Sequence, residues 1–289
     1  MKTLTDTFTL SNGINIPVIG YGTWQTPSDG STRECVKNAV LSGYRHIDTA
    51  FAYGNEAEVG EGIRTSGVSR QDIFLTTKHW VTERGYKKTI KAVETSLKNL
   101  GTDYLDLYLI HWPAVSKVSP EWEEINASTW KAFEKMYTDG KIRAIGVSNF
   151  EKKHIDSLLK YAEIRPQVNQ LEFHPGYTQY DTVKYMQACG ILVEAWSPLG
   201  SGAVLSNERL KEIAAEYNKD TAQLCVKFAL QNGILPLPKS TNPDRMKSNA
   251  DISDFTISEE HMKELLSFPL LGFSGFSPEN APADALADN

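Results

Sequence analysis

Four polar side chains at or just after the ends of short apolar runs could together move a proton. Tyr53 carries a phenol, which has a pKa of about 10 in water and is a poor acid at neutral pH. An ammonium beside it, that of Lys78, would stabilise the phenolate and make donation easier, and Asp48 would supply the counter-charge that a buried ammonium needs. His111 could hydrogen-bond a carbonyl oxygen and orient it. The set suits delivery of a proton to a carbonyl oxygen.

Each of these residues also has a plainer interpretation. Asp48 and Lys78 could form an ion pair that only stabilises the fold, and His111, at the end of a predicted strand, could be a core histidine. Asp48, His111 and His174 could instead hold the metal of a barrel hydrolase. We favour proton transfer without a metal, because carboxylate, phenol, ammonium and imidazole then each have a role.

The elements that must position these side chains are short apolar runs that alternate with amphipathic stretches, a pattern typical of repeated βα units. Eight runs are predicted strands, at 19–22, 46–49, 73–78, 105–111, 144–147, 168–172, 192–195 and 234–238. Eight regularly spaced units favour a closed parallel (β/α)8 barrel, the TIM barrel, over an open doubly wound sheet, since they leave no obvious switch point. The carboxyl ends of barrel strands meet at one face, so the four side chains should converge there.

Helices are predicted between these strands, at 32–42, 86–100, 129–139, 153–161, 181–188 and 221–231. In the second of them, apolar side chains recur at helical spacing, at Ile90, Val93, Leu97 and Leu100. Such a face packs against a sheet.

The chain is expected to be one domain, residues 1–289, that opens with a hairpin over 7–18. The dipeptide Asn12-Gly13 between apolar residues predicts a type I′ turn, and the hairpin should cap the barrel. The tail 277–289 is rich in Pro, Ala and acidic residues and is predicted to be loosely held.

Composition narrows the class of partner. The chain has 289 residues, a formal net charge of -6 and a sequence pI near 5.6, which argue against nucleic acid and anionic membrane as partners. The apolar runs are strand-sized and no secretory signal precedes them, so a cytoplasmic protein with a small-molecule partner is expected. Cys35, Cys189 and Cys225 are widely spaced and are predicted to be buried, reduced thiols.

Four stretches of this sequence resemble signatures of the aldo-keto reductases: G-Y-R-H-I-D-T-A-F-A-Y-G-N-E (43–56), L-D-L-Y-L-I-H-W-P (105–113), I-G-V-S-N-F (145–150) and L-P-K-S-T-N-P-D-R (237–245). The resemblance covers nearly the whole chain, and E-A-W-S-P-L-G (194–200) is similar to a bacterial branch that includes diketogluconate and glyoxal reductases. It implies hydride transfer from NADPH to small aldehydes, ketones, dicarbonyls or keto-sugars, with Tyr53 protonating the nascent alkoxide and with no metal. Members of this family are often monomers, so the resemblance also implies a monomer. A non-enzymatic NADP(H)-binding protein on the same fold is the alternative.

The resemblance also implies which residues hold the cofactor NADPH or NADP+. Trp196 would stack on the nicotinamide, at a position that is often tyrosine in the family, and Lys239 and Arg245 would favour the 2′-phosphate of NADP(H). Asn249 matches an adenine contact, although Ser248 replaces the glutamate that often precedes it. The other implied cofactor residues are Gly22, Thr23, Trp24, Ser148, Asn149, Gln170, Ser197, Leu199, Ser201, Ser240 and Thr241.

For the substrate, the resemblance points to an aromatic wall of Trp24, Trp80 and Trp112 beside His111. Phe273 and Phe276 near the C-terminus could complete it. The stretch between Pro113 and Trp130 is short and predicts a modest loop, hence an open site with broad substrate acceptance.

Overall fold

The computed structural model describes residues 3–27 and 29–281. Eight parallel strands form its centre, and each pairs with the next along the chain. They are β3 (Tyr21–Gly22), β4 (His46–Asp48), β5 (Phe74–His79), β6 (Leu105–Ile110), β7 (Ile142–Ser148), β8 (Val168–Glu172), β9 (Leu192–Trp196) and β10 (Leu235–Pro236). This order confirms the predicted βα repeat.

Backbone hydrogen bonds between the first and last strands close the sheet into a barrel. The N–H of Gly20 donates to the carbonyl of Pro236 at 3.0 Å, and that of Gly22 donates to the carbonyl of Pro238 at 3.2 Å. Glycine is required at this seam, because a Cβ on Gly20 would lie 2.5 Å from Leu237 and 2.6 Å from His46. The predicted (β/α)8 barrel is confirmed.

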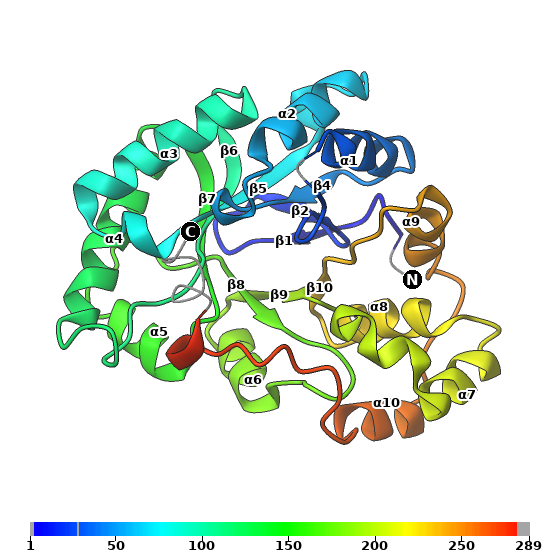
Figure 1. Ribbon diagram of the computed structural model, residues 1–289. Helices are drawn as coiled ribbons and strands as arrows, with labels where there is room; N and C mark the ends of the chain where they lie inside the picture. The colour runs from blue at the N-terminus through cyan, green and yellow to red at the C-terminus, as the bar shows by residue number, and fades with distance from the viewer. Residues whose placement is uncertain (1–2, 28, 282–289) are drawn as a thin grey trace.

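Helices surround the barrel (Figure 1). They are α1 (Ser31–Leu41), α2 (Glu56–Thr65), α3 (Tyr86–Leu100), α4 (Trp122–Thr138), α5 (Lys152–Leu158), α6 (Tyr180–Ala188), α7 (Glu208–Glu216), α8 (Thr221–Gln231), α9 (Pro243–Ala250) and α10 (Glu259–Leu266). Short 3-10 turns are η1 (Phe51–Tyr53), η2 (Arg70–Asp72), η3 (Val81–Glu83), η4 (Gly200–Ser206) and η5 (Pro278–Asn280). Among the described residues, none of the helices is long and apolar enough to cross a bilayer.

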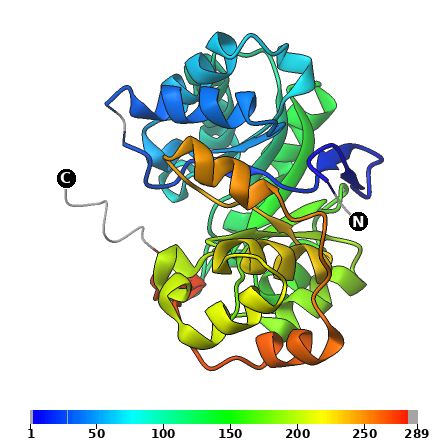
Figure 2. The ribbon, with the colours of Figure 1, turned by 90° about the vertical axis from the view of Figure 1, so that its right-hand side faces the viewer.

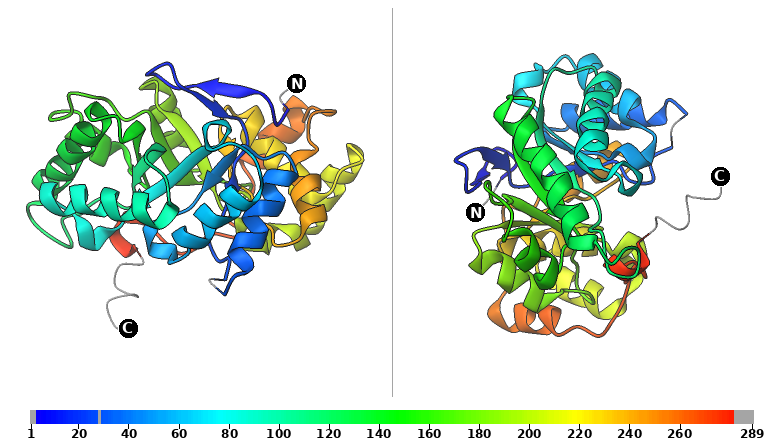
Figure 3. Two further views of the ribbon diagram at one scale, coloured as in Figure 1. Left: turned by 90° about the horizontal axis from the view of Figure 1, so that it is seen from above. Right: turned by 90° about the vertical axis from the view of Figure 1, so that its left-hand side faces the viewer.

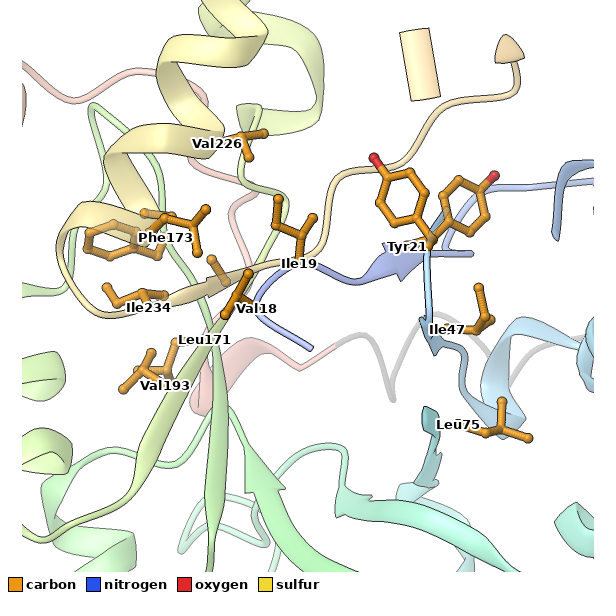
Figure 4. Close-up of a cluster of buried hydrophobic side chains, with 14 of the residues drawn as sticks. Val18, Ile19, Tyr21, Ile47, Leu75, Leu171, Phe173, Val193, Val226 and Ile234 are labelled. Carbon is orange, nitrogen blue, oxygen red and sulfur yellow. The ribbon is translucent and has the colours of Figure 1, made fainter. Parts of the chain in front are cut away.

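The apolar core lies mainly between the strands and the helices. Leu171 of β8, Val193 of β9 and Val226 of α8 belong to this layer (Figure 4). On α3, Val93, Leu97 and Leu100 of the predicted apolar face are buried. Burial of these side chains is the main force that holds the helices on the barrel.

The predicted hairpin is present, as β1 (Thr7–Thr9) paired with β2 (Asn15–Pro17). Its turn is not the predicted type I′, because only Gly13, at φ 85°, has left-handed backbone there. Gly13 N–H donates to the Leu10 carbonyl and Leu10 N–H to the Ile14 carbonyl, both at 2.8 Å, so the loop has three residues. That is the arrangement in which a type I turn is followed by one left-handed glycine.

The hairpin lies against one end of the barrel. Leu10 and Ile16 are buried in a small apolar cluster with Leu107, Leu109 and Val168 from the barrel strands. In Figures 2 and 3 the dark blue hairpin lies on the side opposite the red C-terminal segment. It therefore covers the end of the barrel away from the strand carboxyl ends.

Other details differ from expectation. Helix α4 begins at Trp122 rather than 129, so the connection after β6 is shorter than the stretch up to Trp130 suggested. Cys35 and Cys225 are buried free thiols, but Cys189 is only partly buried, and that part of the cysteine prediction is wrong. Residues 278–280 of the predicted loose tail form η5, while 282–289 lie outside the described residues.

Candidate active site

The four side chains expected to move a proton lie together at the carboxyl ends of the strands. Asp48 ends β4, Lys78 is near the end of β5, and His111 follows β6 directly. The Lys78 Nζ donates to Asp48 Oδ1 at 2.6 Å and to the Thr49 carbonyl at 3.0 Å, and it lies 3.4 Å from the Tyr53 hydroxyl. Each ammonium hydrogen thus has an oxygen partner, which is what a fully buried lysine requires.

Lys78 remains an ammonium in spite of its burial. Burial alone would lower its pKa, but Asp48 and then Tyr53 raise it, and the net result is a pKa above the usual value of 10.5. Burial is also the largest influence on Tyr53, and it raises the pKa of the phenol. Lys78 lowers that pKa, as predicted, yet its effect is smaller than that of burial. The predicted effect of Lys78 thus has the right direction, but burial outweighs it, and the net pKa of Tyr53 in the protein without ligand lies above its usual value.

His111 is a neutral imidazole. Burial, and then the charge of Lys78, hold its pKa well below 6.5. Its ring packs edge-on against Trp80, with centroids 5.1 Å apart, and against Tyr53 at 5.7 Å. A neutral imidazole carries one N–H, so it can donate a hydrogen bond to a carbonyl oxygen without competing for the proton of Tyr53.

Asn55, which was not predicted as a site residue, ties down the loop that carries Tyr53. Its Oδ1 accepts from the Thr49 hydroxyl at 2.8 Å, and its Nδ2 donates to the Thr23 carbonyl at 3.2 Å and to the Thr26 hydroxyl at 3.1 Å. These bonds join the loop after β3 to the loop after β4. The tyrosine is thereby held in a fixed place by buried polar contacts.

A second buried carboxyl lies behind Asp48. Gln170 Nε2 donates to Asp48 Oδ2 at 2.9 Å and to Glu194 Oε2 at 2.8 Å. Both amide hydrogens are used, so the Gln170 carbonyl oxygen is the group left to bond a ligand. Burial, with a further effect of Asp48, raises the pKa of Glu194 to about 8. Sequence reasoning missed Glu194, although it stands in the E-A-W-S-P-L-G stretch.

One cavity of about 610 Å³ opens over these groups. The expected site residues that line it are Gly22, Trp24, Asp48, Tyr53, Trp80, His111, Trp112, Asn149, Gln170, Trp196, Ser197, Leu199, Ser201 and Lys239. Lining residues not expected are Gln25, Thr26, Ala52, Pro198, Gly202, Leu205 and Leu237. Phe276 lines the cavity too, whereas Phe273 packs on Tyr177, with ring centroids 4.4 Å apart.

Two aromatic rings of the cavity wall pack against each other. Trp24 and Trp196 meet edge to face, with centroids 6.1 Å apart. The Trp196 indole N–H donates to Asn149 Oδ1 at 2.9 Å, and Asn149 Nδ2 donates to the Ser148 hydroxyl at 3.1 Å. Ser148 itself is buried and donates to the Gln170 backbone carbonyl at 2.9 Å. Thr23, also buried, donates to the Asp48 carbonyl, so both residues brace the wall from behind.

The remaining expected cofactor residues lie around α9, at one end of the cavity. The Asn242 side chain caps this helix by accepting from the N–H groups of Asp244 and Arg245. Lys239 lines the cavity, and neither it nor Arg245 forms an ion pair within the described part of the chain. Two unpaired cations at a helix N-terminus suit a phosphate group. Near them, Ser240 and Thr241 precede the helix, and Asn249 is buried in its last turn.

No metal site is evident around the site. Within residues 3–27 and 29–281, no three His, Cys, Asp or Glu side chains come together in a group that could hold a metal ion. His174 lies against Glu172 at 3.4 Å and against the Pro175 carbonyl. The structure thus does not bring Asp48, His111 and His174 together as ligands.

Comparisons with known proteins identify relatives of this chain. A family model described as "Aldo/keto reductase family" matches residues 18–268. The glyoxal reductase of Bacillus subtilis (strain 168) is 48% identical over 262 residues, covering 91% of this chain and 92% of that protein. The 9,11-endoperoxide prostaglandin H2 reductase of Trypanosoma cruzi is 45% identical over 260 residues, 89% of each chain.

Solved structures agree with the sequence relatives. An aldo-keto reductase from a deep-sea metagenome library has a TM-score of 0.87 at 42% identity, and covers 94% of this chain and 97% of that one. A Bombyx mori aldo-keto reductase in complex with NADP has a TM-score of 0.86 at 33% identity, with 93% and 94% covered. The resemblance found in the sequence is confirmed, and the chain belongs to the aldo/keto reductase family.

Proposed function

We propose that this chain uses NADPH to reduce small aldehydes, ketones, dicarbonyls or keto-sugars to alcohols, with Tyr53 as the proton donor. The observation that carries the proposal is the Tyr53 hydroxyl, which lies 3.4 Å from the buried Lys78 ammonium and lines a cavity walled by tryptophans. A non-enzymatic protein would have no need for this ammonium, which is costly to bury. The names of the relatives, among them reductases and a morphine 6-dehydrogenase of Pseudomonas putida, also favour an enzyme.

The charges of the site support a general acid. Tyr53 is protonated at neutral pH, because burial raises further the pKa of a phenol that already lies near 10 in water, and it can donate this proton to the oxygen that gains negative charge as the hydride is transferred. When the phenol donates to the carbonyl oxygen, the phenolate that remains is stabilised by the hydrogen bond and charge of Lys78. Asp48 keeps Lys78 charged throughout. His111 donates its N–H to the same carbonyl oxygen and so directs it toward Tyr53.

NADPH, when bound, supplies the hydride. The cavity wall fits its nicotinamide, because the wall includes the aromatic ring of Trp196 and the Gln170 carbonyl oxygen is free to accept from a carboxamide. We assign Asn149 and Gln170, which line the cavity, to that carboxamide, with Ser148 holding Asn149 from behind, and Gly22 and Trp24 to the adjoining wall, with Thr23 behind it. Ser197, Leu199 and Ser201 are assigned to the pyrophosphate, Lys239, Ser240, Thr241 and Arg245 to the 2′-phosphate, and Asn249 to the adenine.

The rest of the cavity would hold the substrate. Trp24, Trp80, His111 and Trp112 line the cavity, and Phe276 adds a further ring. Apolar walls with a few polar groups at one point suit compact carbonyl compounds.

We further propose a single-domain monomer that acts in the cytoplasm. The acidic pI near 5.6 and the single barrel support this arrangement. Sedimentation velocity would show one species at the mass of the chain, 32.2 kDa. A dimer at working concentration would overturn the monomer.

The absorbance of NADPH tests the function. Mixed with methylglyoxal and with a panel of aldehydes and keto-sugars, the protein should oxidise NADPH with at least one of them. NADPH consumption by none would overturn the proposal. Lys239→Met and Arg245→Met should raise the KM for NADPH much more than that for NADH, because only NADPH carries the 2′-phosphate. An equal change for both cofactors would overturn the assignment of these cations.

A further inference from the structure

The segment 271–276 crosses between two loops at the mouth of the cavity, and we refer to it as the strap. It lies between α10 and η5 in the sequence, and in Figure 1 the chain runs in red from the end of α10 across the lower half of the picture to η5. Leu271 N–H donates to the Gly176 carbonyl at 3.3 Å, in the loop after β8. A Cβ on Gly272 would lie 3.2 Å from the Gly200 Cα, in the loop after β9. The strap therefore touches both loops through the backbone.

A buried carboxylate holds the middle of the strap. Glu172, the last residue of β8, is only 1% exposed. Its Oε1 accepts from the Ser274 N–H at 2.9 Å, and its Oε2 accepts from the Ser274 hydroxyl at 2.7 Å. Within the described residues no lysine or arginine pairs with Glu172, and its other partner is the His174 ring at 3.4 Å. A buried carboxylate without hydrogen bonds is costly, so the two bonds from Ser274 stabilise Glu172 and hold Ser274 in place.

A further hydrogen bond links Ser274 to Phe276, a residue of the cavity wall. The Ser274 hydroxyl, which donates to Glu172, also accepts from the Phe276 N–H at 3.2 Å. The Phe276 ring lines the cavity and meets Trp112 edge-on, with centroids 6.4 Å apart. Glu172 thus reaches the cavity wall through one serine, although it does not line the cavity itself.

We propose that Glu172 is a positioning residue which, through Ser274, holds Phe276 against Trp112 and so sets the size of the carbonyl substrate. The inference rests on the proposed reductase function and adds what determines its substrate range. With the strap held, the wall is closed around compact aliphatic carbonyls. With the bond to Ser274 lost, Phe276 is free to move away, so compact substrates lose contact while bulky aromatic aldehydes gain room.

A double-mutant cycle between Ser274 and Phe276 tests this. Ser274→Ala removes the hydroxyl bonds to Glu172 and to Phe276 but keeps the backbone N–H bond, and is milder than Glu172→Gln. It should lower the ratio of kcat/KM for methylglyoxal over a bulky aromatic aldehyde by roughly five- to tenfold, mainly through KM. In a Phe276→Ala background the same change should have almost no effect on the ratio.

The matched control is Ser267→Ala, another serine on the C-terminal side of α10. Among residues 3–27 and 29–281, its hydroxyl bonds to the Lys263 and Glu264 carbonyls of that helix and to no other group, so the change should leave the substrate ratio unchanged. If Ser274→Ala shifts the ratio equally with and without Phe276, or lowers kcat/KM for all substrates alike, the inference is overturned. If the unaltered chain turns over none of the substrates, the proposed function fails, and this outcome is distinct from the ones that overturn the role of Glu172.

Amide hydrogen exchange gives a readout that needs neither cofactor nor substrate. The Phe276 amide should exchange faster in Ser274→Ala, and the Ser274 and Phe276 amides should both exchange faster in Glu172→Gln. Ser267→Ala should leave both rates as they are. Unchanged exchange in Glu172→Gln would show that Glu172 does not hold the strap, and would overturn the inference whatever the kinetics.

Discussion

Replacing Asp48 by asparagine removes the negative charge that faces the buried Lys78 ammonium. The strongest contact of that ammonium is to Asp48 Oδ1, at 2.6 Å, and Asp48 is the largest influence that raises the lysine pKa. Without it, burial dominates, and the lysine must either stay charged at a high cost or lose its proton. In both cases the folded protein loses stability, and a lysine without its proton no longer stabilises a tyrosine phenolate.

The expected cost follows from the burial of the pair. Removing one partner of a buried ion pair destabilises a protein by about 3–5 kcal/mol. At about 2.1 cal/mol/K per residue, a chain of 289 residues has an unfolding entropy of about 0.6 kcal/mol/K. Asp48→Asn should therefore lower the Tm by about 5–8 °C and the turnover of methylglyoxal by at least about tenfold.

A second variant isolates the charge pair. In Asp48→Asn combined with Lys78→Met, no unpaired charge is buried, so the double variant should be more stable than Asp48→Asn alone, while turnover remains lost. Calorimetry and steady-state kinetics on both variants measure this. Additive losses of stability, or an Asp48→Asn variant as stable as the unaltered chain, would refute the reasoning about the pair.

Three further predictions concern stability. Burial lowers the pKa of His46 to about 3, of His79 to about 4 and of His154 to about 3, so below about pH 6.5 protons bind mainly to the unfolded chain. Urea titrations should show the free energy of unfolding decreasing from pH 6.5 to 5, by about 1.4 kcal/mol per pH unit for each imidazole, and an increase would contradict this. Because the pKa of Glu194 is raised to about 8, the folded chain should lose stability as the pH rises from 4.5 through 8. The free energy of unfolding of Glu194→Gln, compared with that of the unaltered chain, should therefore be more favourable at pH 8 than at pH 5. An equal difference at both pH values would contradict this. Ile16→Ala should cost about 2–5 kcal/mol in urea unfolding with NADPH affinity unchanged, because Ile16 is fully buried at the far end of the barrel; a loss below about 1 kcal/mol would disprove that role of the hairpin.

The central site could be predicted from the sequence, because in a parallel barrel all residues at the carboxyl ends of the strands lie at the same face. Asp48, Lys78 and His111 each stand at the carboxyl end of an apolar run, and in a barrel such ends can only meet at one face. The strands themselves were recognisable as short runs rich in apolar residues, because both of their faces are buried. Fold class and the proton-transfer group therefore followed from the same pattern.

Other features depend on contacts that spacing does not encode. The pKa of Tyr53 is raised by burial and lowered by Lys78, and the direction of the net shift depends on how completely the side chain is buried. Helix α4 begins at Trp122, and the side chain of the preceding N-cap residue, Glu121, makes no capping bond, so no start signal marked this position. The strap is anchored by a carboxylate about a hundred residues away in the sequence, at a separation no local pattern reports.

The most direct test of the account is to measure turnover and NADPH binding in Tyr53→Phe. This variant keeps the ring and removes only the hydroxyl, which lies 3.4 Å from Lys78 Nζ. Reduction of methylglyoxal should fall by about 10²–10⁴-fold, while the Kd for NADPH, measured by fluorescence, changes by less than about twofold. Turnover that survives the substitution, or NADPH binding that is lost with it, would contradict the role of Tyr53 as proton donor.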